Sequence, residues 1–87
     1  MINIAVVGSG SMGSGIAQVA ATAGHQVCLY DNNPDALARA EHKLRQLVDR
    51  LVEKNKFSRS EGEAVLGRIQ FVQSLYDCNH AGLIIEA

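Results

Sequence analysis

The sequence lacks the features that mark several specialised protein classes. Its 87 residues contain no tryptophan, one proline and two cysteines, and the formal net charge is -1. Because nucleic-acid surfaces and membrane-binding patches need clustered Lys and Arg, we expect neither kind of partner. The apolar runs are far shorter than the roughly 20 residues that cross a bilayer, and the first residues lack the order of a secretory signal. We therefore expect one ordinary globular unit that works in the cytoplasm, unless a targeting segment lies outside it.

The cysteines and histidines give no sign of a metal or catalytic site. Cys28 and Cys78 stand far apart in the chain, with no C-x-x-C pattern and no histidine at zinc-ligand spacing. We interpret both as buried or partly buried thiols without a metal or redox role. His25, His42 and His80 are interpreted as surface or loop residues, because catalysis by a histidine needs an orienting acid and a substrate pocket.

Four short apolar runs predict β-strands. They begin with "INIAVVG" from Ile2 and continue at residues 27–30, 69–72 and 83–87. Short apolar runs of this kind are typical of parallel strands with both faces covered. Because helical patterns alternate with the first three runs, the predicted fold class is α/β: a Rossmann-like, doubly wound parallel sheet with the strand order 3-2-1-4.

Helical spacing of apolar residues predicts three helices. The first covers residues 11–23 and ends at Gly24, a left-handed C-cap. The second begins with Asn33 as N-cap and a proline at its first position, and its apolar stripe is about twelve to twenty residues long. Ser58 and Glu61 in "SRSE" resemble a capping box that opens a third helix, so helices two and three form a hairpin between strands two and three. The stripe of the first helix consists of Met12, Ile16, Val19, Ala20 and Ala23.

The last apolar run predicts that the sheet is incomplete. Leu83, Ile84 and Ile85 have the character of an interior strand, and a doubly wound domain continues with a further helix and further strands. Left at an edge, such a strand exposes apolar surface and unpaired backbone groups to water. We therefore interpret residues 1–87 as the N-terminal portion of a dinucleotide-binding domain, whose remainder belongs to a longer chain or comes from a partner.

The stretch "VVGSGSMGSG" resembles either a flexible linker or a phosphate-binding loop. Its spacing Gly8-x-Gly10-x-x-Gly13 follows the first strand directly and opens the first helix, which is the context of a dinucleotide-binding fingerprint. Gly8 permits the tight turn, Gly10 leaves room for a pyrophosphate, and Gly13 lets the helix lie close to the sheet. Because an apolar strand and a helix bracket the glycines, the linker interpretation fails. The absence of a following lysine excludes a Walker loop.

Backbone N–H groups at the start of the first helix supply the expected phosphate contacts. Ser9, Ser11 and Met12 lie at this point of the loop, where the positive end of the helix dipole favours an anion. The hydroxyl groups of both serines are possible additional donors. Gly15 has no role in the fingerprint and is interpreted as a glycine that packs the helix against its neighbours.

Asp31 closes the second strand and is predicted to bind the adenosine ribose of the cofactor. Its carboxylate would accept hydrogen bonds from the two ribose hydroxyls and would repel a 2′-phosphate. The next residues, 32–34, contain no arginine that would reverse this preference. NAD is therefore the predicted cofactor, in preference to NADP.

Three stretches together carry a family resemblance. "IAVVGSGSMGSGIAQVAATAGHQVCLYD", the hairpin with "VEKNKFS" and the closing "LIIEA" resemble the N-terminal part of the NAD-binding domain of 3-hydroxyacyl-CoA dehydrogenases, including 3-hydroxybutyryl-CoA dehydrogenases. The resemblance implies hydride transfer between the 3-hydroxyl carbon of an acyl-CoA and NAD, by a homodimeric parent enzyme. In the family the catalytic His–Glu pair, the substrate-orienting Ser and Asn and the helical dimerisation domain lie beyond the position of Ala87. No catalytic residue is therefore expected in this chain.

The resemblance also implies contacts outside the glycine-rich loop. Ala87 matches a family position beside the cofactor, and Glu86 is interpreted as part of the site wall. Lys54 and Lys56 fall near the tip of the hairpin, which the family uses against the CoA portion of the substrate, and an ammonium group suits a phosphate there. A solvated helix end explains these two lysines equally well.

Other function classes stay open on the sequence. One is a different NAD-dependent dehydrogenase of the same fold group, such as a sugar-acid or lens-crystallin-like enzyme, or a flavoprotein. An FAD enzyme more often has Glu than Asp where Asp31 stands, which counts against FAD. The other class is a nucleotide-binding module without catalytic activity.

Overall fold

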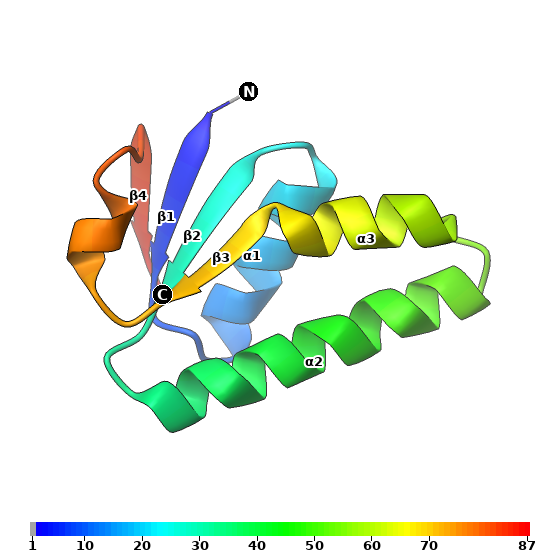
Figure 1. Ribbon diagram of the computed structural model, residues 1–87, viewed down its shortest axis with the longest axis horizontal. Coiled ribbons are helices and arrows are strands. Elements are labelled where there is room, and N and C mark those ends of the chain that lie inside the picture. The colour runs from blue at the N-terminus through cyan, green and yellow to red at the C-terminus, as the bar shows by residue number, and fades with distance from the viewer. Residues whose placement is uncertain (1) are drawn as a thin grey trace.

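Residues 2–87, which the computed structural model describes, fold into a parallel sheet with helices packed against it (Figure 1). The strand order is β3-β2-β1-β4 and every neighbouring pair is parallel, which confirms the predicted α/β class, the Rossmann-like sheet and the 3-2-1-4 order. In chain order the elements are β1 (Asn3–Val7), α1 (Ser11–Thr22), β2 (Gln26–Tyr30), α2 (Pro34–Glu53), α3 (Arg59–Gly67), β3 (Ile69–Val72), the 3-10 helix η1 (Leu75–Cys78) and β4 (Leu83–Glu86).

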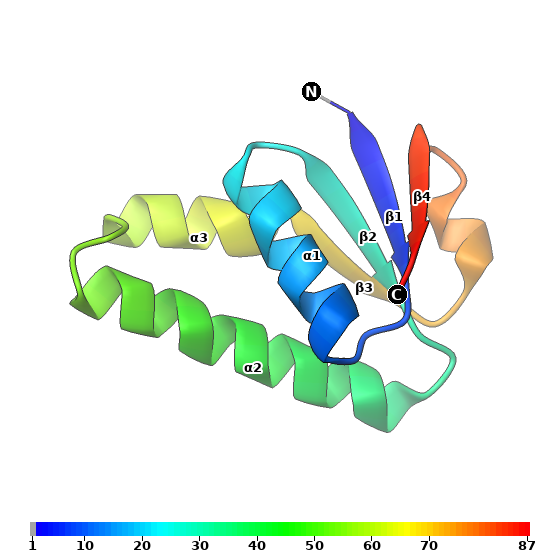
Figure 2. The same ribbon diagram turned by 180° about the vertical axis from the view of Figure 1, so that it is seen from behind.

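The two faces of the sheet differ in what covers them. On the helical face, Val6 and Leu29 are fully buried in a core that α1, α2 and α3 complete, and each buried side chain of this size contributes about 1.5–3 kcal/mol. The helix α1 lies behind the sheet in Figure 1 and in front of it in Figure 2. On the other face, only a small cluster of Ala5, Val72 and Cys78 is buried. The main core of the described residues therefore lies between the sheet and the three helices.

The buried side of α1 consists of small residues, and the predicted stripe was wrong in part. Met12 and Val19 from that stripe are 68% and 66% exposed. A side chain at position 13 would overlap the carbonyl oxygen of Gly8, so α1 lies too close to the sheet for large residues on its inner side. Only small side chains fit between α1 and the sheet, so a pattern of large apolar residues does not identify the buried side of this helix. The buried residues of α1 are Gly13, Ala17, Ala20 and Ala21.

The hairpin of α2 and α3 begins and turns as predicted. The Asn33 side chain accepts hydrogen bonds from the N–H groups of Asp35 at 2.9 Å and Ala36 at 3.2 Å. At α3, the Ser58 hydroxyl accepts from the Glu61 N–H while the Glu61 carboxylate accepts from the Ser58 N–H, a complete capping box. Side chains therefore close the amino ends of both helices. None of the helices in residues 2–87 combines the length and apolar character needed to span a membrane.

The connection from β3 to β4 contains η1, a short helix that the sequence pattern did not indicate. This short helix brings Cys78 against β2, where it forms a disulfide with Cys28; the two Cα atoms are 5.8 Å apart. The interpretation of both residues as thiols was therefore wrong. Cys28 and Cys78 are 50 residues apart in sequence, and only the crossover of this connection over the open face of the sheet brings them together.

The strand β4 lies at an edge of the sheet, beside β1. Leu83 and Ile84 are 46% and 66% exposed. This exposure agrees with the expectation that an apolar, interior-type strand stands at the edge of the described sheet.

Candidate nucleotide-binding site

The glycine-rich loop leaves β1 in a tight turn at the carboxyl edge of the sheet. Gly8 has a φ of +104°, a left-handed conformation that favours glycine. Its N–H donates to the carbonyl oxygen of Tyr30 at 2.8 Å, which ties the turn to β2. Gly13 packs directly against Gly8, whereas a Cβ at Gly10 would meet no atom within 4 Å. The turn and the close helix approach are as predicted, and Gly10 borders open space.

The amino end of α1 is open. Gly10 stands at the N-cap, and within residues 2–87 no side chain caps the first turn. The first intrahelical hydrogen bond runs from the Ser14 N–H to the Gly10 carbonyl oxygen at 2.9 Å. The N–H groups of Ser11, Met12 and Gly13 precede it, and they coincide with the positive end of the helix dipole. This end of α1 is suited to hold a phosphate or pyrophosphate group.

Asp31 follows β2 and is fixed beside the loop by three hydrogen bonds. The Asn33 N–H donates to Oδ1 at 2.9 Å, and Ser9 donates to Oδ2 through its N–H at 3.1 Å and its hydroxyl at 2.8 Å. The Asn33 N–H, and after it the two Ser9 donors, lower the pKa of Asp31 below its ordinary value, against a smaller opposing effect of burial. The carboxylate is therefore held charged at this edge of the sheet. Ser9, predicted as a phosphate ligand, directs both its donors to Asp31.

A groove of about 400 Å³ lies between the loop and α2. Arg39 and Lys43 line it from α2, and Ser11 and Gly15 line it from α1. The Arg39 guanidinium also lowers the pKa of Asp31. Neither cation could be recognised from the positions directly after Asp31, because the helical turn of α2 brings later residues back to the loop. A Cβ at Gly15 would meet no atom within 4 Å, so its interpretation as a packing glycine was wrong.

Ala87 lies against the same loop. Its N–H donates to the carbonyl oxygen of Val7 at 2.9 Å, and its own carbonyl oxygen would lie 3.0 Å from a Cβ built on Gly8. Glu86 pairs with Val7 in the register of β1 and β4 and is exposed. The ends of β1 and β4 therefore meet at the glycine-rich loop, and Ala87 lies beside Gly8.

The two hairpin lysines lie far from this loop. Lys54 and Lys56 are exposed and occupy the turn between α2 and α3, at the opposite end of α2 from Asp31 (Figure 1). A helix of this length, 20 residues, measures about 30 Å. Neither lysine takes part in the ion pairs of residues 2–87, which join Arg45 to Glu41 and Arg59 to Asp49. The structure thus gathers residues 8–13, Asp31 and Ala87 at one place and leaves the lysines apart.

The sequence matches a known family and curated relatives. The family described as "3-hydroxyacyl-CoA dehydrogenase, NAD binding domain" matches over residues 3–87. The chain is 44% identical over 84 residues to "Probable 3-hydroxybutyryl-CoA dehydrogenase" of Bacillus subtilis (strain 168). The aligned residues make up 97% of this chain and 29% of that relative. It is 42% identical over 90 residues to 3-hydroxyadipyl-CoA dehydrogenase of Escherichia coli (strain K12). That alignment covers 100% of this chain and 19% of the relative. The chain therefore spans less than a third of the length of these relatives.

Solved structures share the fold at similar levels of identity. The 3-hydroxybutyryl-CoA dehydrogenase of Escherichia coli K12 superimposes with a TM-score of 0.93 and 40% identity, over 98% of this chain and 18% of that one. The (S)-3-hydroxybutyryl-CoA dehydrogenase of Ralstonia eutropha gives a TM-score of 0.94 and 32% identity, over 100% of this chain and 31% of that one. With the family match and the geometry of the loop, these similarities show that the chain belongs to the NAD-binding domain of the 3-hydroxyacyl-CoA dehydrogenase family.

Proposed function

We propose that this chain holds NAD for an enzyme that transfers a hydride between the 3-hydroxyl carbon of a 3-hydroxyacyl-CoA and the nicotinamide ring. The observation that carries the proposal is the open amino end of α1 beside the fixed carboxylate of Asp31. Relatives named as 3-hydroxybutyryl-CoA and 3-hydroxyadipyl-CoA dehydrogenases support the substrate class. No observation favours a sugar-acid or crystallin-like dehydrogenase, a flavoprotein or a module without catalytic activity.

In this proposal the glycine-rich loop binds the pyrophosphate of NAD. The N–H groups of Ser11, Met12 and Gly13 donate to its oxygens, and the helix dipole stabilises its charge. Gly10 allows the close approach because it has no side chain and borders open space. Gly8 and Gly13 hold the loop and α1 in the geometry that the contact needs. Bound NAD supplies the hydride acceptor or donor, while these residues only bind and orient it.

Asp31 binds the adenosine ribose in this proposal. Three donors occupy its carboxylate, which has roughly four lone-pair sites. The hydroxyl of Ser9 therefore rotates away when the ribose hydroxyls bind, while the two backbone N–H groups keep the carboxylate in place. The negative charge disfavours a 2′-phosphate, so we propose NAD rather than NADP, with Arg39 offsetting part of that repulsion.

The remaining proposed contacts concern the cofactor outside the glycine-rich loop and the CoA. Ala87 lies beside the loop and is proposed as a cofactor contact, with Glu86 in the wall of the site. Lys54 and Lys56 are proposed to bind CoA phosphates at the hairpin tip, because both ammonium groups are exposed and outside the ion pairs of the described residues.

The parent enzyme is proposed to supply everything that the chemistry needs beyond binding. We place the catalytic residues, the remaining strands of the dinucleotide-binding domain and the helical dimerisation domain outside residues 1–87. The curated relatives, of which this chain covers 29% and 19%, are long enough to hold them. The parent is proposed to be a homodimer that works in the cytoplasm on an acyl-CoA.

Titration calorimetry with NAD on the intact protein tests this function. Asp31→Ala removes the charge-assisted hydrogen bonds to the ribose. Because even one such bond is worth about 1.5–3 kcal/mol, we expect an affinity loss of at least roughly tenfold. Asp49→Ala serves as the matched control, because Asp49 lies on the outer side of α2 and pairs only with Arg59. If Asp31→Ala binds NAD as tightly as the parent does, the ribose assignment is wrong. If the longer parent enzyme transfers no hydride between NAD and 3-hydroxybutyryl-CoA, the proposed activity is wrong.

A further inference from the structure

The disulfide joins the sheet to η1, which covers part of its open face. Cys28 lies in the middle of β2, paired in register with Ala5 on β1 and Gln70 on β3. Cys78 is the last residue of η1, and the chain returns from it to β4 through residues 79–82. The bond therefore fixes the β3–β4 connection against the centre of the sheet, on the face opposite the helices.

Little else in the described residues holds η1 in place. Its side chains at Leu75 and Tyr76 are 51% and 82% exposed, so Tyr76 adds little packing and Leu75 is only half covered. The small cluster on this face contains only Ala5, Val72 and Cys78 as fully buried members. Without the covalent bond, η1 would be held by this small cluster with its partly buried neighbours Tyr30 and Ala81, and by the hydrogen bonds between Asn3 and the chain before β4.

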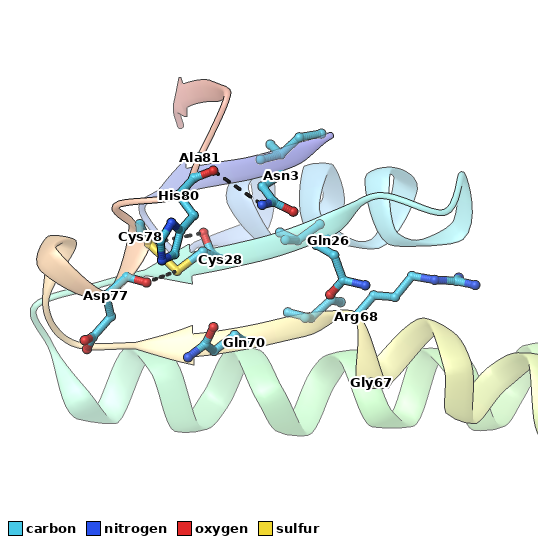
Figure 3. Close-up of a pocket in the computed structure, with 13 residues that line it drawn as sticks. Asn3, Gln26, Cys28, Gly67, Arg68, Gln70, Asp77, Cys78, His80 and Ala81 are labelled. Carbon is cyan, nitrogen blue, oxygen red and sulfur yellow. Dashed lines mark hydrogen bonds between the residues drawn. A yellow bond between two sulfur atoms is a disulfide. The ribbon is translucent and has the colours of Figure 1, made fainter. Parts of the chain in front are cut away.

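The disulfide is accessible to a small molecule. Both cysteines line a groove of about 480 Å³ on this face, together with residues at the amino ends of the strands (Figure 3). None of residues 8–13 of the glycine-rich loop lines it. Cys28 is only partly buried, whereas Cys78 is 9% exposed. Polar side chains, among them Gln26, Gln70 and His80, share the groove with the sulfur atoms. A water-soluble thiol can thus approach the sulfur of Cys28 from solvent.

The same geometry provides hydrogen-bond partners for the reduced state. The Cys28 Sγ lies 3.7 Å from the carbonyl oxygen of Asp77, and the Cys78 Sγ lies 3.9 Å from the carbonyl oxygen of Cys28 (Figure 3). A disulfide sulfur has no hydrogen to donate, so these contacts become hydrogen bonds only when both residues are thiols. A carbonyl oxygen is therefore close to each sulfur atom and can accept from the thiol that forms on reduction.

We propose that Cys28 and Cys78 form a reversible thiol–disulfide exchange site for small thiols of the glutathione type, and that its oxidation state decides whether η1 is fastened to β2. In the reducing direction, a thiolate attacks Cys28 and releases Cys78 as a thiolate, which leaves a mixed disulfide at Cys28. A second thiol attacks the outer sulfur, releases Cys28 and departs as the small-molecule disulfide. The protein disulfide gains two electrons and the two thiols lose them, and their two protons pass to Cys28 and Cys78.

Peptide mapping of the intact protein tests the exchange directly. Because no Lys or Arg occurs in residues 1–38 or 69–87, trypsin places Cys28 in the peptide that ends at Arg39 and Cys78 in the peptide that begins at Ile69. The folded protein is equilibrated in buffers with different ratios of reduced to oxidised glutathione, alkylated with iodoacetamide and digested without reductant. We expect the linked peptides in the oxidising buffers and the two separate, alkylated peptides in the reducing ones, with full return when the buffer is exchanged.

Limited proteolysis then tests the consequence for η1. Chymotrypsin cleavage after the exposed Tyr76 is expected to be at least severalfold faster in the reduced protein than in the oxidised one. Cys28→Ser and Cys78→Ser cannot form the disulfide, so we expect both variants to be cleaved in both buffers as fast as the reduced form of the unsubstituted protein. The proposal is overturned if the linked peptides never form, if they persist in excess reduced glutathione on the folded protein, or if the parent is cleaved after Tyr76 at one rate in both states. NAD binding does not enter these readouts, so they are independent of the proposed function.

Discussion

The amino ends of the helices of this protein are built in two ways. At α2 and α3, the side chains of Asn33 and Ser58 accept hydrogen bonds from the first turn, and Glu61 completes the box at α3. At α1, glycine occupies the N-cap and no side chain of the described residues accepts from the first turn. Side-chain caps stabilise a helix by about 1 kcal/mol each. The first-turn donors of α1 therefore stay open, as the proposed pyrophosphate contact requires, whereas those of α2 and α3 are used for stability.

The largest loss of stability and of NAD binding is expected from a substitution that separates α1 from the glycine-rich loop. Gly13→Val places a side chain where the Gly8 carbonyl oxygen already lies, so we expect a loss of about 3 kcal/mol or more in the free energy of unfolding, with NAD binding lost as well. Gly15→Val is the matched control on the same helix, because open space surrounds Gly15 and the change should stay within about 0.5 kcal/mol. Urea unfolding of the intact protein measures both. Equal losses for the two variants would contradict the close approach at Gly13.

Removing the caps of the closed helix ends should have a smaller and purely structural effect. Asn33→Ala and Ser58→Ala each delete one capping side chain, and we expect about 1 kcal/mol of destabilisation for each. The backbone N–H of residue 33 still donates to Asp31 in the first variant, so the affinity for NAD should be unchanged in both. Thermal unfolding and NAD calorimetry on the same samples measure the two effects. A tenfold loss of NAD affinity in Ser58→Ala would contradict the division between capped and uncapped ends.

The elements and the loop could be predicted because local sequence signals determine them. The cap at Asn33, the box at Ser58 and the spacing of Gly8, Gly10 and Gly13 depend on residues a few positions apart. Such signals also gave the strand order, since alternating strands and helices with right-handed crossovers leave few topologies.

Features that depend on contacts between distant segments could not be predicted in this way. The partner of Cys28 comes from a crossover 50 residues later. The exposed sides of Met12 and Val19 reflect how closely α1 approaches the sheet, which hydrophobic spacing does not encode. The contact of Ser9 with Asp31 and the position of Arg39 likewise join separate elements at the edge of the sheet. These contacts could be identified only once the positions of the elements relative to one another were known.

The smallest expected effect concerns the acid dependence of stability at the carboxylate beside the open helix end. The hydrogen bonds from Asn33 and Ser9 depress the pKa of Asp31 in the folded state, so its stabilising contribution is present above the unfolded pKa, about 3.9, and is lost as the pH falls through the folded pKa. Asp31→Asn should therefore be less stable than the parent near neutral pH, and the difference should shrink below about pH 4. Urea unfolding at both pH values measures it. A difference that grows on acidification would contradict the depressed pKa.

The most direct measurement adds a cap to the open end of α1. Gly10 has a φ of -67° and a ψ of -169°, which any residue adopts, and a Cβ there would meet no atom within 4 Å, so Gly10→Asp is expected to fold normally. An aspartate at the N-cap accepts from the first turn, and relative to glycine it changes helix stability by only a few tenths of a kcal/mol, in the favourable direction.

Calorimetry with NAD and urea unfolding are carried out on the parent and on Gly10→Asp as intact proteins. We predict that the variant is at least as stable as the parent and that its affinity for NAD falls by more than tenfold, because the new carboxylate takes the donors of the pyrophosphate and repels its charge. A variant that remains folded and binds NAD as tightly as the parent would contradict the assignment of the open end of α1 to the cofactor.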